Sequence, residues 1–201
     1  SSIFITGNTA IDALRLTVQE DYHHQVLDQL DPQKKLVLVT MHRRENQGQP
    51  MRAVFGALRE MVDAHPELEV VYPVHLSPAV QEAAKDILGE HNRIHLIAPL
   101  DVFDFHNLAS RSYFIMSDSG GVQEEAPSLG KPVLVLRDTT ERPEGVKAGT
   151  LKLVGTDPER VKEEMTALLT DPDLYQKMAS ARNPYGDGKA SERIVQAIQH
   201  Y

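Results

Sequence analysis

The run KLVLVT, from Lys35 to Thr40, decides the fold because its apolar residues are continuous from Leu36 to Val39 and lack the alternation of a strand with one exposed face. A continuous apolar run of this length predicts a strand buried on both faces, as in a parallel sheet. A helical pattern follows it, with apolar residues from Met51 to Val62 recurring every three or four positions and Pro50 at the first turn. A strand followed by a helix in this way is the beginning of a βαβ unit.

The alternation of strands and helices continues along the chain. Five further strands are predicted: EVVYPV (69–74), RIHLIA (93–98), SYFIMS (112–117), KPVLVL (131–136) and TLKLVG (150–155). Helical patterns separate these strands and follow the last one. The sequence therefore predicts an α/β fold with a Rossmann-like, doubly wound parallel sheet.

The predicted domain covers residues 31–201, and residues 1–30 are expected to flank it. A helix is predicted over AIDALRLTVQEDY in the flanking segment, where His23 and His24 are also placed and given no role. At the other end, Ser191 is the predicted N-cap of a last amphipathic helix that runs to Tyr201.

Composition excludes several classes of protein. Apolar residues make up 41% and charged residues 25% of the 201 residues, as in ordinary globular domains. The net charge of −8 argues against a nucleic-acid partner, and no apolar run approaches the roughly 18 residues of a membrane span. The absence of cysteine excludes thiolate metal sites and suits a reducing cytoplasm. The chain begins without Met or a signal peptide, so we expect a piece of a longer protein.

Most residues with unusual chemistry follow predicted strands. The loops concerned are MHRREN, HLSP, PLDVFDFHN, DSGG and RDTTERPEG, whereas the opposite loops, such as DAHPEL, read as plain turns. Ligands of open parallel sheets bind beyond the carboxyl ends of the strands. The sequence therefore predicts a ligand site at this edge.

The stretch SDSGGVQEEA indicates what kind of ligand this is. Gly120 and Gly121 let the backbone approach a ligand closely, and the free amides of a helix start attract an anion, with Ser119 as a cap or a further donor. The alternative is a tight turn with a serine cap. Glu124 and Glu125 project about 100° apart on a helix, so one could accept hydrogen bonds from ribose hydroxyls while the other is solvated. An anion pocket beside a hydroxyl acceptor is what a nucleotide requires.

Other candidates at this edge have ordinary alternatives. His42, Arg43 and Arg44 could donate to a diphosphate, or form a solvated loop with Glu45 as an ion partner. His75 by default is an ordinary loop histidine, and Phe105 is either a core residue or a ring that stacks on a base. Arg137 and Arg142 by default are surface residues. The histidines lie on separate loops, and no metal-binding motif is present.

The motifs MHRREN, PVHLSP, DSGGVQEEAPSLGKPVLVLRDTTERPEG and NPYGDGKASERI together resemble the non-hydrolysing UDP-N-acetylglucosamine 2-epimerases of bacteria. The resemblance implies one Rossmann-like half of a two-domain GT-B fold, with residues 1–30 as the interdomain crossover. It also implies interconversion of UDP-GlcNAc and UDP-ManNAc, by elimination of UDP and re-addition after reprotonation at C2. Neither a metal nor another cofactor is implied.

The resemblance assigns roles to individual positions. UDP contacts fall on His42, Phe105, Ser119, Gly120, Gly121, Glu125 and Arg142, and His42 is also implied in catalysis. Arg43 and His75 would contact a second UDP-GlcNAc that acts as an allosteric activator. Some members have Gln near the base where this chain has Leu100, which puts that base contact in doubt.

The acids that the family uses for proton transfer belong to a first domain that this sequence lacks. The chain is therefore expected to be inactive alone, with that domain and possibly a second copy as partners. Two alternatives stay open: a stand-alone nucleotide-sugar sensor and a GT-B glycosyltransferase domain.

Overall fold

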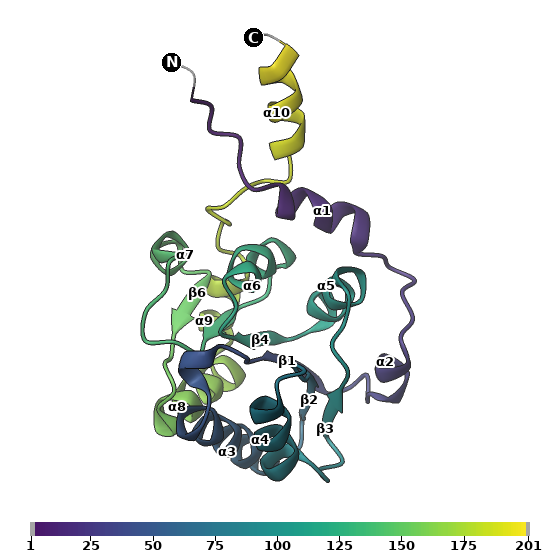
Figure 1. Ribbon diagram of the computed structural model, residues 1–201, viewed down its shortest axis with the longest axis vertical. Coiled ribbons are helices and arrows are strands. Elements are labelled where there is room, and N and C mark those ends of the chain that lie inside the picture. Colours follow the sequence, from purple (N-terminus) through teal and green to yellow (C-terminus); the bar gives the residue numbers. More distant parts are fainter. Residues whose placement is uncertain (1–2, 200–201) are drawn as a thin grey trace.

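The computed structural model describes residues 3–199, in which six parallel strands form one sheet in the order β3-β2-β1-β4-β5-β6 (Figure 1). The strands are β1 (Lys35–Thr40), β2 (Leu68–Pro73), β3 (Ile94–Ile97), β4 (Phe114–Ser117), β5 (Val133–Val135) and β6 (Leu151–Leu153). The longer helices are α1 (Thr9–Thr17), α3 (Gln49–Ala64), α4 (Pro78–Leu88), α5 (Val102–Arg111), α8 (Pro158–Thr170), α9 (Pro172–Ala179) and α10 (Ala190–Gln199). The shorter helices are α2 (Gln25–Gln29), α6 (Gly120–Glu125) and α7 (Pro143–Ala148), with 3₁₀ helices η1 (Arg44–Asn46) and η2 (Ala126–Leu129).

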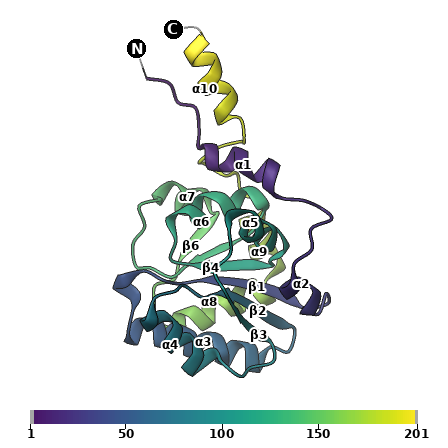
Figure 2. The same cartoon turned by 45° about the vertical axis from the view of Figure 1, so that its right-hand side comes forward.

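Helices cover both faces of the sheet, which confirms the doubly wound prediction. Figure 2 shows α5 and α6 on one side of the strands and α3, α4 and α8 on the other. Successive side chains of β1 point to opposite faces of the sheet. Val37 and Val39 pack with the α3 layer, whereas Leu36 and Leu38 pack with the α5 layer. All four are buried, which is why the run in the sequence is continuous rather than alternating.

All six predicted strands are present, within one or two residues of their predicted ends. The helix after β4 is less regular than its sequence suggests. It passes into η2 at Ala126, because Pro127 has no amide proton to continue the α-helical bonds. Gly130, at φ 67°, then ends it in the left-handed conformation that glycine adopts without strain.

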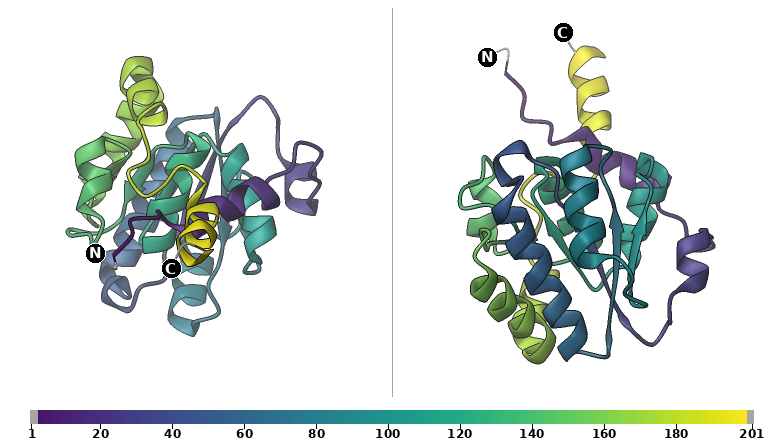
Figure 3. Two further views of the ribbon diagram at one scale, coloured as in Figure 1. Left: turned by 90° about the horizontal axis from the view of Figure 1, so that it is seen from above. Right: turned by 60° about the horizontal axis from the view of Figure 1, so that its bottom comes forward.

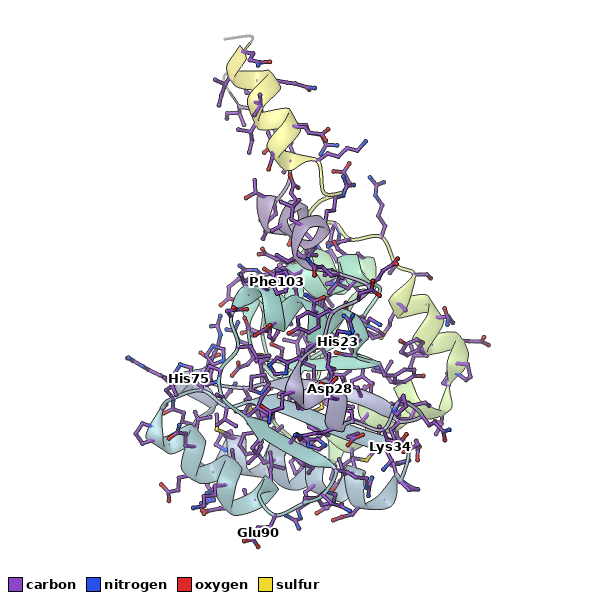
Figure 4. The ribbon with its side chains drawn as sticks, turned by 90° about the vertical axis from the view of Figure 1, so that its right-hand side faces the viewer. His23, Asp28, Lys34, His75, Glu90 and Phe103 are labelled. Carbon is purple, nitrogen blue, oxygen red and sulfur yellow. The ribbon has the colours of Figure 1, made fainter. Side chains whose placement is uncertain are left out.

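The flanking helix is shorter than predicted, because α1 ends at Thr17 and not at Tyr22. The side chain of Asn107, on α5, forms hydrogen bonds with the backbone on both sides of that point. Its side-chain amide donates to the Thr17 carbonyl at 2.7 Å, and its oxygen accepts from the Gln19 amide at 2.9 Å. The prediction that the two neighbouring histidines lie in the same helix is also wrong. His24 caps α2, and His23 precedes that helix, near Asp28 (Figure 4).

The last helix begins at Ala190, so the prediction of Ser191 as its N-cap is wrong. The cap comes from α1. Asp12 accepts from the backbone amides of Ala190 and Ser191, at 3.1 and 2.6 Å. Seen from above in Figure 3, α10 and α1 lie one over the other, above α5 and α6. The predicted end of this helix, at Tyr201, lies outside the described residues, and the domain boundary near residue 30 stays a prediction.

Candidate functional site

The predicted loops meet where the strand order reverses. β1 is followed in the chain by β2 on one side of it, whereas β4 lies on its other side, so the loops after β1 and β4 diverge from one point. In open parallel sheets this is where ligands bind. His42 and Arg43 follow β1, and Ser119 follows β4, which confirms that these segments are brought together.

Asp118 holds the two loops to each other. Its side chain is completely buried, and one carboxylate oxygen, Oδ2, accepts hydrogen bonds from three groups of the β1 loop. These donors are the His42 amide at 3.0 Å, the Arg43 amide at 2.8 Å and the Asn46 side chain at 3.0 Å. Sequence reasoning missed Asp118 and Asn46. A carboxylate directly after a buried strand was the available signal.

The two candidate histidines lie together. The rings of His42 and His75 stack at 5.3 Å between centroids and 10° between planes. His42 Nδ1 also lies 3.5 Å from Asp118 Oδ1, so the buried carboxylate orients the ring. His75 is exposed at the end of β2, and Figure 4 shows it at the edge of the molecule.

The two glycines of α6 differ in what surrounds them. A Cβ on Gly120 would lie 3.1 Å from Arg142 Cζ, so the guanidinium of Arg142 packs directly over that backbone. A Cβ on Gly121 would meet only Ser119 Oγ, at 3.9 Å, so packing within the chain does not require glycine there. Ser119 stands at the N-cap position, but its hydroxyl makes no capping bond. The helix start therefore has an arginine beside it and open space in front of Gly121.

The expectation that one of the paired glutamates is solvated is wrong, because both are partly buried. Glu124 accepts from Arg142 Nε at 2.7 Å and from the Asn8 side chain. Glu125 points to the other side of the helix, with Oε2 3.3 Å from Nε2 of His106. The angular separation predicted from the sequence is confirmed, and each carboxylate has a partner of its own.

Arg137 is buried, at 7% exposure, so its default reading as a surface residue is wrong. It donates to Glu45 at 2.9 Å and, through both terminal nitrogens, to Glu141 at 2.6 and 3.0 Å. The hydrogen bonds from Arg137 lower the pKa of Glu141 to about 2. Glu141 also lies 3.9 Å from the guanidinium groups of both Arg43 and Arg142. Glu45, the ion partner of the arginines beside it in the alternative interpretation of the β1 loop, pairs with Arg137 instead.

The aromatic candidate lies on the α5 side of the sheet. Phe105 is partly buried, and its ring meets the His106 ring edge-on at 6.5 Å. Leu100 lines a separate groove of about 690 Å³ between α2 and β3. Packing within the chain thus covers part of the Phe105 ring. Its place near a base stays a prediction.

The candidate site is an exposed face of the domain: Gly121 is exposed, and His42, Arg43 and Ser119 are partly exposed. A larger hollow, of about 960 Å³, lies between α1 and the loop 182–188 and includes none of the candidate residues. Within residues 3–199, no three His, Asp or Glu side chains are grouped as metal ligands. None of the helices in that range is both long and apolar enough to span a membrane.

Comparison with known proteins identifies the family. A family model described as UDP-N-acetylglucosamine 2-epimerase matches residues 1–199. A protein of that name from Bacillus subtilis is 62% identical over 201 residues, which are 100% of this chain and 53% of the relative. The chain thus spans about half the length of that curated relative.

Solved structures agree with this match. A structure from Listeria monocytogenes described as a UDP-N-acetylglucosamine 2-epimerase has a TM-score of 0.94 and 59% identity, over 98% of this chain and 53% of its own. One from Neisseria meningitidis, bound to UDP-GlcNAc, has a TM-score of 0.90 and 43% identity, over 98% and 55%. A C-terminal domain of a Francisella tularensis group 1 glycosyl transferase, 12% identical with a TM-score of 0.60 over 91% and 96%, shares the fold alone. The sheet, the switch-point loops and these matches together show that the chain belongs to the UDP-N-acetylglucosamine 2-epimerase family.

Proposed function

We propose that this chain is the UDP-binding half of a non-hydrolysing enzyme that interconverts UDP-GlcNAc and UDP-ManNAc. One observation carries the proposal: α6 has a start that is open in front of Gly121 and a half-buried carboxylate, Glu125, and the guanidinium of Arg142, from the loop before α7, packs over its Gly120. Diphosphate and ribose need such groups side by side. The structure of the Neisseria relative, bound to UDP-GlcNAc, supports the choice of ligand.

Each predicted contact has a chemical role in this proposal. The diphosphate accepts hydrogen bonds from the first amides of α6, from Ser119 Oγ and from the terminal nitrogens of Arg142. Glu125 accepts from the ribose hydroxyls, and the uracil lies near Phe105. His42, held at its backbone by Asp118, faces the departing diphosphate. His75 stacks on His42, and Arg43 donates from Nε to the Asp118 carbonyl; in this proposal both residues would contact the second UDP-GlcNAc, the activator.

Elimination also requires a base at C2 and a proton donor for the return step. Among the described residues, the switch-point carboxylates already have basic or amide partners: Asp118, Glu124 and Glu141. The chain therefore supplies stabilisation of the leaving UDP and not proton transfer at C2.

A second domain would close the open face. Apolar side chains are exposed on the N-terminal segment, α1 and α10, and these are Ile3, Ile5, Leu16, Val195 and Ile198. Exposed apolar side chains on neighbouring elements, here α1 and α10, are a feature of docking surfaces. They support our proposal that a partner domain carrying the acids completes the enzyme.

Calorimetric titration with UDP tests the proposal. We expect binding by this chain, weakened about tenfold or more by Glu125→Ala, because the ribose hydroxyls lose a charged acceptor. Glu163→Ala, on the far helix α8, is the matched control and should leave the affinity unchanged. Incubation with UDP-GlcNAc in D₂O should give no exchange at C2. Undetectable UDP binding, or exchange at C2 by this chain alone, would contradict the proposal.

A further inference from the structure

His106 is a buried histidine that directly contacts one of the proposed ligand contacts. It lies on α5 with 2% exposure, and both ring nitrogens have partners from other elements. Nδ1 is 2.8 Å from Thr17 Oγ1 of α1, and Nε2 is 3.3 Å from Glu125 Oε2 of α6. Thr17 and Glu125 are 89 and 19 residues away in sequence, so no local motif reveals this arrangement.

The partners determine which nitrogen donates. An ionised carboxylate can only accept, so the nitrogen that faces Glu125 carries a proton. The Thr17 hydroxyl also lies 3.1 Å from the Ala13 carbonyl, to which it can donate. If His106 has one ring proton, Thr17 donates to Nδ1; if the ring has two, Thr17 accepts from Nδ1 and donates to Ala13. In both arrangements Nε2–H points at Glu125.

We propose that His106 is a positioning residue that fixes Glu125 for the ribose of the bound nucleotide, an inference that rests on the proposed function. The buried ring holds Oε2 from one side, and no described side chain forms a hydrogen bond with Oε1, which is left for the ribose hydroxyls. Without His106 the carboxylate has several rotamers, and choosing one on binding costs affinity.

The same ring ties the ribose contact to the flanking segment. Thr17 ends α1, and Asn107, next to His106, holds the chain on both sides of that end. The position of Glu125 therefore depends on the docking of α1 onto α5. If α1 were displaced, His106 would lose its contact with Thr17, and the contact of Glu125 with the ribose hydroxyls would weaken. The diphosphate contacts of α6 would persist.

Two substitutions separate positioning from packing. In His106→Gln, the amide nitrogen takes the place of Nε2 and can still donate to Glu125. In His106→Asn, the shorter side chain reaches only the place of Nδ1, so contact with Thr17 is kept and contact with Glu125 is lost. Both variants remove the ring, so their losses in stability should be similar, as measured by urea unfolding.

The readout is the ratio of dissociation constants for 2′,3′-dideoxy-UDP and UDP, measured by calorimetry on this chain. This ratio reports the ribose hydroxyls alone. We expect the dideoxy-UDP to UDP ratio to be about tenfold lower in His106→Asn than in wild type, and in His106→Gln to stay close to the wild-type value. Equal ratios in wild type and His106→Asn, or the reverse order of the two variants, would overturn the inference.

Glu125→Ala distinguishes the two levels of the argument. If it lowers the ratio but His106→Asn does not, the proposed UDP site stands and His106 has no positioning role. If Glu125→Ala leaves the ratio unchanged, the assignment of Glu125 to ribose is itself wrong.

Discussion

Replacing Asp118 tests whether one buried carboxylate holds the candidate site together. Truncation to alanine removes the acceptor of three N–H groups: two backbone amides, at residues 42 and 43, and one N–H of the Asn46 side chain, which keeps its bond to the Leu136 carbonyl. Each unsatisfied buried donor costs about 1–3 kcal/mol, and local relaxation recovers part of the sum. We expect Asp118→Ala to lower the free energy of unfolding by about 4 kcal/mol.

Asp118→Asn isolates the charge. All three donors converge on Oδ2, so an asparagine oxygen in that place keeps those bonds, whereas an amide nitrogen in the place of Oδ1 removes the longer bond from the His42 amide, at 3.2 Å. The hydrogen bonds then have a neutral acceptor, and the expected loss is about 1–2 kcal/mol.

Urea unfolding followed by circular dichroism measures both losses. The control is Asp86→Asn, which neutralises an exposed aspartate paired with Arg52 at 2.6 Å. Exposed ion pairs contribute at most about 1 kcal/mol, so the control should be nearly neutral. A loss for Asp118→Ala no larger than that of the control would refute the reasoning, since the β1 loop would then be held by other contacts.

Three further outcomes are expected. Gly121→Ala should leave stability unchanged or raise it by up to about 1 kcal/mol, because the site is open and helical, yet weaken UDP binding measured by calorimetry. Glu124→Gln should also weaken UDP binding, because Arg142 loses its charged partner; unchanged affinity would show that this pair does not position the guanidinium. The pKa of Glu141 is lowered from 4.5 to about 2, so its ion pair stabilises the fold above pH 4.5 and is lost as pH falls toward 2; the stability difference between wild type and Glu141→Gln should vanish over that range.

The sheet could be predicted from the sequence because its central strands, β1 and β5 most clearly, have continuous apolar runs. Burial on both faces produces that signal locally, without knowledge of partners. The edge that carries the ligand site follows from the same reasoning, since the carboxyl ends of parallel strands share one edge. The position of the candidate loops is therefore confirmed, whereas their roles toward UDP stay predictions.

The errors concern residues whose partners are distant in the chain. Ser191 is a good N-cap residue, but Asp12, from the other end of the sequence, supplies the cap. Arg137 is buried and donates to Glu45, 92 residues away, and Glu124 is partly buried and pairs with Arg142, 18 residues away. Propensity and spacing report local preferences, so contacts between remote elements require the folded structure.

The loop after β1 is fastened to Asp118 largely through main-chain amides. Any residue other than proline offers such an amide, so these main-chain bonds survive substitution at positions 42 and 43, while replacing Arg43 removes its Nε bond to the Asp118 carbonyl, at 2.9 Å. This makes the two positions suitable for saturation libraries. Directed evolution could vary the chemistry presented to a sugar nucleotide there while the supporting scaffold stays rigid.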